Sequence, residues 1–186
     1  MTPSELYHLL HQVSHSIWDR RNLAAVVQED PQLISSLLKI AFQDDAPISC
    51  KACWVLEFVA KERLDSMLPH LNVFTTNIGL VRQEASIRPL AKICEYLTKS
   101  YFIDKSTATQ NAITEEDLEQ ITKTCFDWLI GEHKVAAKAY SMTGLLLLGQ
   151  KFKWIHPELK LVLEQNYHRG SAAYKARARQ TLAKIS

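Results

Sequence analysis

A short pattern recurs along the chain at nearly constant spacing. In each copy a basic residue precedes small and then large apolar residues, and the copies begin at Lys51, Arg88, Lys138 and Lys175. The copies lie 37, 50 and 37 residues apart, and leaving out the eleven residues of the polar segment 103–113 brings the 50 to about 39. Periods close to 40 residues are typical of stacked helix pairs. The sequence therefore favours an extended array of helices over a closed bundle.

Signals that begin and end helices occur from one end of the chain to the other. Residues 2–5 have the form of a capping box with proline at the first helical position, and Thr114 precedes a run of acids that suits a first helical turn. Gly131, Gly149 and Gly170 each follow an apolar run, as a glycine at a helix C-terminus does. Only 5 Gly and 6 Pro occur, and no segment alternates with the two-residue period of a strand. These signals predict ten helices, near 3–14, 17–28, 31–43, 47–63, 66–78, 80–101, 115–130, 133–149, 157–167 and 171–185.

An acid followed six residues later by a base occurs at two of the four copies. The pairs are Asp45 with Lys51 and Glu132 with Lys138, whereas the copy at Arg88 has no acid six residues before it. This arrangement resembles HEAT repeats, in which an acid in the turn and a base six residues later form a ladder across successive repeats. The resemblance implies that these five residues form such a structural ladder.

The period, the helix signals and this resemblance together predict an all-α fold. We expect a right-handed α-α superhelix of about five HEAT/ARM-like helix pairs, forming a single domain over 1–186 with an exposed loop near 103–113. The longest nearly apolar stretch, 139–149, is too short to cross a bilayer, and Glu5 and three histidines stand where a signal peptide would be apolar. The 4 cysteines, without such a signal, do not indicate a disulfide framework. A cytoplasmic protein is therefore expected.

Three segments, 48–58, 135–142 and 170–179, are also similar to short bacterial helical-repeat proteins that are sometimes labelled adenylosuccinate lyase. The lyase superfamily has a mobile serine-rich loop with the signature Ser-Ser-x-Met-Pro-x-Lys-x-Asn, which has no counterpart in this sequence. The chain is also too short for the long helical core of that superfamily. We therefore expect no lyase activity.

Cysteine spacing gives the sharpest single motif, Cys50-x-x-Cys53. A redox pair needs a strand-to-helix junction that lowers the pKa of the first thiol, and a zinc site needs a second pair of ligands. The motif lies inside a predicted helix, and Cys94 and Cys125 stand alone in the sequence. Small core residues are the main interpretation, with redox or zinc chemistry as the alternative.

Two further groups have spacings that chemistry can use. His8, His11 and His15 lie within about 60° of one another on the first predicted helix, which suits a metal but also suits a solvated polar face. Glu57 and Glu95 occupy similar positions on successive helices, and paired carboxylates can do acid–base work. Repeats also generate such pairs without any chemical role. We predict no metal site.

Charge is spread unevenly along a nearly neutral chain. Lys and Arg number 22 against 20 Asp and Glu, and residues 94–186 hold 13 bases and 10 acids against 9 and 10 in residues 1–93. The last 22 residues contain five bases and no acid. On the last predicted helix Arg177 and Lys184 lie on one flank of the apolar stripe, and Lys175 and Arg179 lie on the other. One flank can therefore line a groove, but all five bases cannot do so together.

Catalysis is the function class with the least support. The sequence has no nucleophile elbow and no glycine-rich loop for phosphates, and it points to no cofactor. We expect a non-catalytic module that binds another macromolecule, in the first place a protein, on its curved face, with no membrane partner. The candidate binding residues are Arg169, Lys175, Arg177, Arg179, Lys184, Glu57 and Glu95.

The alternative is nucleic-acid binding through the basic C-terminal repeat. A HEAT-like fold with a basic C-terminal repeat resembles the alkylpurine DNA glycosylases. In that family a Trp and a catalytic Asp stand one helical turn apart on a basic concave face. Here the residues four positions beyond the tryptophans are Asn22, Phe58, Glu132 and Glu158. None of these is an aspartate, so we expect binding without glycosylase chemistry.

Overall fold

The computed structural model describes residues 1–185, and within that range it contains eleven α-helices, one 3₁₀ helix and no strand. The all-α prediction is confirmed. The elements are α1 (Pro3–Gln12), α2 (Ile17–Glu29), α3 (Gln32–Ala41), α4 (Ile48–Glu62), η1 (Leu64–His70), α5 (Leu71–Ile78), α6 (Glu84–Phe102), α7 (Thr107–Ala112), α8 (Glu115–Ile130), α9 (Val135–Leu148), α10 (Ile155–Tyr167) and α11 (Ala172–Leu182).

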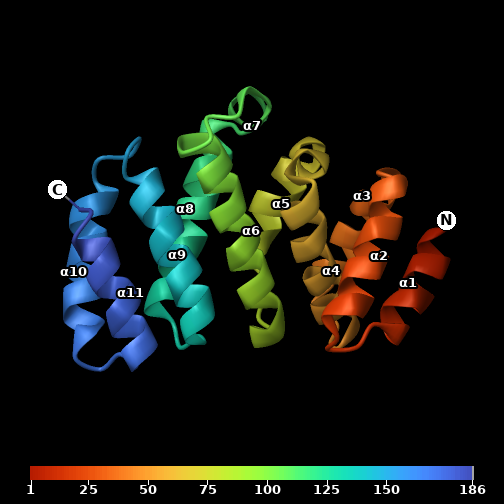
Figure 1. Cartoon of the computed structure of the whole chain (residues 1–186), viewed down its shortest axis with the longest axis horizontal. Helices are drawn as coiled ribbons and strands as arrows, with labels where there is room; N and C mark the ends of the chain where they lie inside the picture. Colours follow the sequence, from red (N-terminus) through yellow and green to blue (C-terminus); the bar gives the residue numbers. More distant parts are fainter. Residues whose placement is uncertain (186) are drawn as a thin grey trace.

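The helices stand side by side in an elongated row, with the two ends of the chain at opposite ends of the molecule (Figure 1). Five of them, α2, α4, α6, α9 and α11, each pack against the next, and we call them the central row. A second row lies against it: α3 packs on α4, α8 packs on α9, and α10 packs on both α9 and α11. The three inner helices of this row, α4, α6 and α9, therefore contact central neighbours on both sides as well as a helix of the second row.

Helix α6 shows how little surface this packing leaves open. Between Ser86 and Ser100 every side chain is buried except Arg88, Lys92, Tyr96 and Lys99. These four positions are four, four and three residues apart, so they lie along one line on the helix surface. The rest of the helix contributes to a continuous apolar core that runs through the whole stack.

Two predicted boundaries are wrong. The helix expected over 66–78 is divided into η1 and α5, because Pro69 cannot donate an α-helical hydrogen bond at that point. The segment 103–113, expected as an exposed loop, contains α7: its side chains are mostly exposed, but Thr109 is buried and shares a 2.7 Å hydrogen bond with Ser100. The Ser106 side chain caps α7 by accepting from the Thr109 N–H at 3.3 Å.

The predicted ladder is also wrong in its pairing. Among the described residues neither Lys51 nor Lys138 forms an ion pair; instead, the Lys51 ammonium donates to the carbonyl oxygen of His11 at 2.7 Å. That carbonyl belongs to the last turn of α1, where it has no intrahelical partner and carries partial negative charge, so it competes successfully with Asp45. Arg88 does form an ion pair, but with Glu57 of the preceding central helix.

The packing of α11 on α9 and α10 yields a first prediction. Ala178 on α11 is completely buried, whereas its neighbour Arg179 is exposed. Ala178→Asp places an unpaired carboxylate in this contact, so we expect the free energy of unfolding to fall by about 3 kcal/mol or more. Arg179→Asp is the matched control and is expected to change it by no more than about 0.5 kcal/mol. Urea denaturation followed by circular dichroism makes the comparison, and equal effects would contradict the placement of α11.

Candidate binding face

The central row leaves one connected polar surface uncovered. Its side chains come from all five central helices and touch one another from helix to helix. We call it the open face, and its residues are Arg20, Trp54, Glu57, Arg88, Lys92, Tyr96, Lys99, Tyr140, Thr143, Arg177 and Lys184.

At the N-terminal end of the open face an arginine covers a tryptophan. The Arg20 guanidinium lies 4.6 Å from the centre of the Trp54 ring, and the ring of His15 lies 4.9 Å from the same tryptophan. The Trp54 indole N–H donates to the carbonyl oxygen of Ala85 at 3.0 Å, which ties α4 to the start of α6. Burial lowers the pKa of Arg20, and the positive charge of Arg88 adds to this effect.

A bidentate ion pair joins α4 to α6 next to this cluster. The two terminal nitrogens of Arg88 donate to the two carboxylate oxygens of Glu57, at 3.1 and 2.5 Å. Burial disfavours the charged guanidinium, but the hydrogen bonds and negative charge of Glu57 outweigh it, and the pKa of Arg88 is raised. The pair therefore acts as one rigid unit between two helices.

The centre of the open face is a lysine held between two tyrosines and a carboxylate. The Lys92 ammonium lies 4.4 Å from the ring centre of Tyr140 and 5.0 Å from that of Tyr96, and it donates to Glu95 at 2.6 Å. Glu95 also pairs with Lys99 at 2.9 Å. Burial opposes ionisation of Glu95, but these two ammonium groups reverse the effect and lower its pKa. The carboxylate is thus ionised and fully engaged.

A groove with a cationic rim closes the open face at its C-terminal end. It has a volume of about 190 Å³ and is lined by Lys99, Arg177 and Lys184, together with Ile103 and aliphatic and polar side chains of α9 and α11, and no acid is among its lining residues. Arg177 donates to the hydroxyl of Thr143 at 3.3 Å. Arg177 and Lys184 line the same groove, as the helical spacing predicts.

The other predicted binding residues lie elsewhere. Lys175 and Arg179 are on the flank of α11 away from this groove, and Arg169 lines a different pocket, beside Lys138. Glu57 and Glu95 belong to the open face or lie directly beneath it, but both are held in ion pairs.

Eight side chains of the open face were not among the predicted binding residues: Arg20, Trp54, Arg88, Lys92, Tyr96, Lys99, Tyr140 and Thr143. A signal for two of them exists, because Lys92 and Tyr96 continue the four-residue spacing from Arg88 through a helix that is otherwise apolar. The position of Tyr140 depends on how α9 packs on α6, and nothing local in the sequence reports it.

The cysteines lie in the core. Burial raises the pKa of Cys53 to about 12, and Cys50 donates to the side chain of Gln83, the residue that precedes α6. Cys94 and Cys125, which stand alone in the sequence, are neighbours across α6 and α8, and burial together with the Cys125 thiol raises the pKa of Cys94. The surroundings of Cys53 and Cys94 therefore favour neutral thiols.

His8, His11 and His15 remain separate on the exposed side of the N-terminal segment, with the ring of His11 packed 5.0 Å from that of Tyr7. Within residues 1–185 there is no group of three or more His, Cys, Asp or Glu placed to hold a metal ion.

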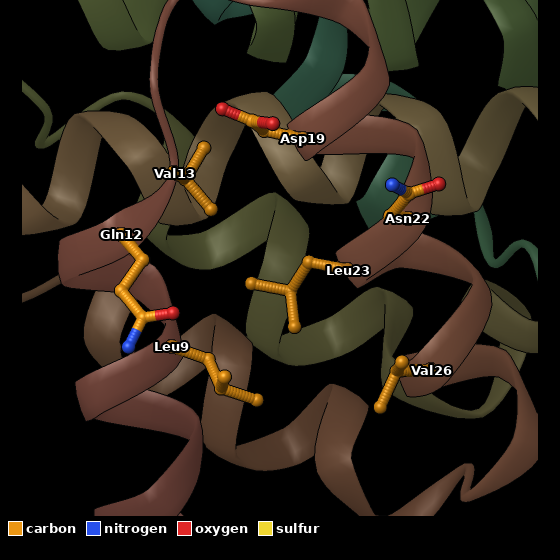
Figure 2. Close-up of a pocket in the computed structure, with 7 residues that line it drawn as sticks. All are labelled: Leu9, Gln12, Val13, Asp19, Asn22, Leu23 and Val26. Carbon is orange, nitrogen blue, oxygen red and sulfur yellow. The ribbon is translucent and has the colours of Figure 1, made fainter.

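A second hollow lies between α1 and α2, with a volume of about 300 Å³. Figure 2 shows the aliphatic side chains of Leu9 and Leu23 pointing toward each other across it, with Gln12 and Asn22 at its margins. Asp19 accepts from both the backbone N–H and the hydroxyl of Ser14, which lowers its pKa. The hollow is mostly apolar, and its one carboxylate is already engaged.

Family models, curated proteins and solved structures give no match to this chain. None of the helices described here has the length and apolar character needed to cross a membrane.

The Glu57–Arg88 pair yields a second prediction. Arg88→Met leaves the half-buried carboxylate of Glu57 without its partner, so we expect the free energy of unfolding to fall by about 2–3 kcal/mol. In the double variant Glu57→Gln with Arg88→Met the stranded charge is gone, and most of the loss should be recovered. Urea denaturation of wild type, both single variants and the double variant completes the cycle. Additive effects would show that the two groups do not interact.

Glu95 yields a third prediction, on pH. Its pKa is lower in the folded protein than its ordinary value of 4.5, so its contribution to stability is present above that value and is lost as the pH falls through the folded-state pKa. Glu95→Gln should therefore reduce the acid-side slope of stability against pH. Glu119→Gln, at an exposed position of α8, is the control and should leave the slope unchanged. Melting temperatures measured between about pH 2 and 7 test this, and equal slopes in wild type and Glu95→Gln would contradict it.

Proposed function

We propose that this chain is a non-catalytic, HEAT-like repeat module that binds another protein on its open face. The regular alternation of a central row and a second row supports the finer assignment of a right-handed superhelix of about five helix pairs. In such stacks the successive inner helices present one long surface, which here is the open face.

The observation on which this proposal depends is the aromatic and cationic cluster around Lys92. Tyrosine, tryptophan and arginine are enriched at protein interfaces, because they bury large areas while keeping a polar group available. The open face holds Trp54, Tyr96 and Tyr140 within a strip of basic side chains, and each of the three is only half-buried. Its bases outnumber its carboxylates, so the partner we infer presents an acidic segment.

The carboxylates of this face argue against acid–base catalysis. Glu57 is held by Arg88, and Glu95 by Lys92 and Lys99. A general acid needs a raised pKa near the working pH, whereas the pKa of Glu95 is lowered. We accordingly expect no fumarate release from adenylosuccinate.

Nucleic-acid binding is the second candidate, and the C-terminal groove is the observation that favours it. Lys99, Arg177 and Lys184 line it without an acid among the lining residues, which suits a phosphate backbone. The net charge of only +2 limits long-range attraction to a polyanion, so this candidate stands behind the first.

Site-specific cross-linking tests the proposal. Tyr96 is replaced by the photoreactive residue benzoylphenylalanine, and the matched control carries the same residue at Val73, an exposed position on α5. Illumination in the native cell should give a defined protein adduct from position 96 and not from position 73. The adduct should weaken in the variant Arg177→Glu with Lys184→Glu, whose melting temperature should stay close to that of wild type.

Nuclease treatment separates the two candidates. An adduct that survives it supports a protein partner, and one that disappears supports nucleic acid in its place. Equal adducts from positions 73 and 96 would show that the open face is not the binding surface.

A further inference from the structure

Carboxylates link successive helices of the central row at their N-terminal ends. In the turn before α6, the N–H of Arg82 donates to the carboxylate of Asp44, which lies in the turn before α4, at 3.4 Å. In the turn before α9, the N–H of Lys134 and the ring of His133 both contact the carboxylate of Glu84, the first residue of α6, at 2.8 Å. At these two steps of the stack, an acid at or just before the start of one central helix meets the turn that begins the next.

At the last step, from α9 to α11, no carboxylate of the described residues makes this contact, although Glu132 stands in the turn before α9. Val135 is the first residue of α9 and so holds the position that Glu84 holds in α6. The turn before α11 contains Arg169, Gly170 and Ser171, and no carboxylate lines the pocket between this turn and the start of α9. Neither α9 nor α11 has an acid in its first turn.

That pocket, which we call the turn pocket, has a volume of about 390 Å³. Two of its side chains, Lys138 and Arg169, are bases that form no ion pair within residues 1–185. Its lining residues are His133, Val135, Lys138, Asn166, Arg169, Gly170, Ser171 and Tyr174.

Two further features concern the hydrogen-bond donors of the residues that line the turn pocket. Tyr174 is 5% exposed, and its buried hydroxyl has no hydrogen-bond partner among the described residues. The neighbouring helices α9 and α11 both begin at this pocket, so the partial positive charges of two helix N-termini lie beside it. Ser171 caps α11 by accepting from the N–H of Tyr174 at 3.2 Å, which leaves the N–H groups of Ala172 and Ala173 without an intrahelical acceptor.

We propose that the turn pocket binds a phosphate group, held by Lys138, Arg169 and the first N–H groups of α11. A phosphate takes the place that Glu84 occupies one step earlier in the stack. Two unpaired bases and two helix N-termini suit a doubly charged anion better than a single carboxylate. The turn pocket is separate from the open face, so this inference does not depend on the proposed function.

Titration with inorganic phosphate tests the inference, with amide resonances followed by NMR at constant ionic strength in potassium chloride. We expect saturable shifts at Ser171, Ala172 and Ala173. Lys138→Gln and Arg169→Gln should each weaken binding about tenfold or more, as expected when one charge-assisted contact is lost. Lys160→Gln, a base on α10 outside the pocket, is the control and should leave the affinity unchanged. Acetate, titrated in parallel, should bind more weakly than phosphate.

Val135→Glu supplies the missing carboxylate from within the chain. Phosphate should then no longer shift the resonances at the start of α11, while the melting temperature shows that the variant is folded. Should this variant fail to fold, Lys138→Gln and Arg169→Gln still decide the question. Shifts that do not saturate, or that persist equally in Lys138→Gln and Arg169→Gln, would overturn the inference. Phosphoserine and a nucleoside monophosphate, titrated in the same way, distinguish a phosphate carried by a protein from one carried by a nucleotide.

Discussion

The packing of α6 between α4 and α9 is the interaction on which the rest of this structure depends. These two contacts are the most extensive that α6 makes, and together with the second row they bury all but four side chains between Ser86 and Ser100. A helix buried to this degree can expose only one narrow line. The chemistry of the open face at its centre is therefore the chemistry of Arg88, Lys92, Tyr96 and Lys99, and their order along α6 determines where each charge lies.

Three carboxylates position basic and N–H groups along the central row. Glu57 links α4 to α6, Glu84 links α6 to the turn before α9, and Glu95 gathers two lysines of its own helix. A buried or half-buried carboxylate is stable only when its oxygens are matched by donors, and these three are matched. The turn pocket is the opposite case, because Lys138 and Arg169 line it and no carboxylate is among its lining residues.

The parts of the fold that could be predicted from the sequence are those with a local cause. The capping boxes at Thr2 and Thr114 are formed as their sequences indicate, and the all-α fold follows from such signals. The short helix α7 had a readable local signal, the capping Ser106, within a polar segment that otherwise resembles a loop. The prediction of a loop over 103–113 gave the polar composition of this segment more weight than the capping pattern at Ser106.

The parts that could not be predicted depend on contacts between distant residues. The six-residue spacing from Asp45 to Lys51 is local, but the ammonium of Lys51 reaches α1, 40 residues earlier in the chain. In the same way, Lys92 meets Tyr140 only because α9 packs on α6 in one particular register. The spacing within one repeat predicts which acid could pair with Lys51. It does not show that an acceptor from another part of the chain, here the carbonyl oxygen of His11, binds the ammonium instead.

The distribution of charge along the open face has a physical consequence for any partner. At the centre, Arg88 and Lys92 are already paired with carboxylates, so a partner there gains little new Coulomb energy and must be held by contact with the aromatic rings. At the C-terminal groove, Arg177 and Lys184 have no such carboxylate among the described residues. An acidic group of a partner can therefore form new ion pairs with both bases. Salt screens exposed charges strongly and aromatic contacts weakly. The two ends of a bound partner should therefore respond differently to ionic strength, with the end at the groove released first and the end over Tyr96 and Tyr140 retained.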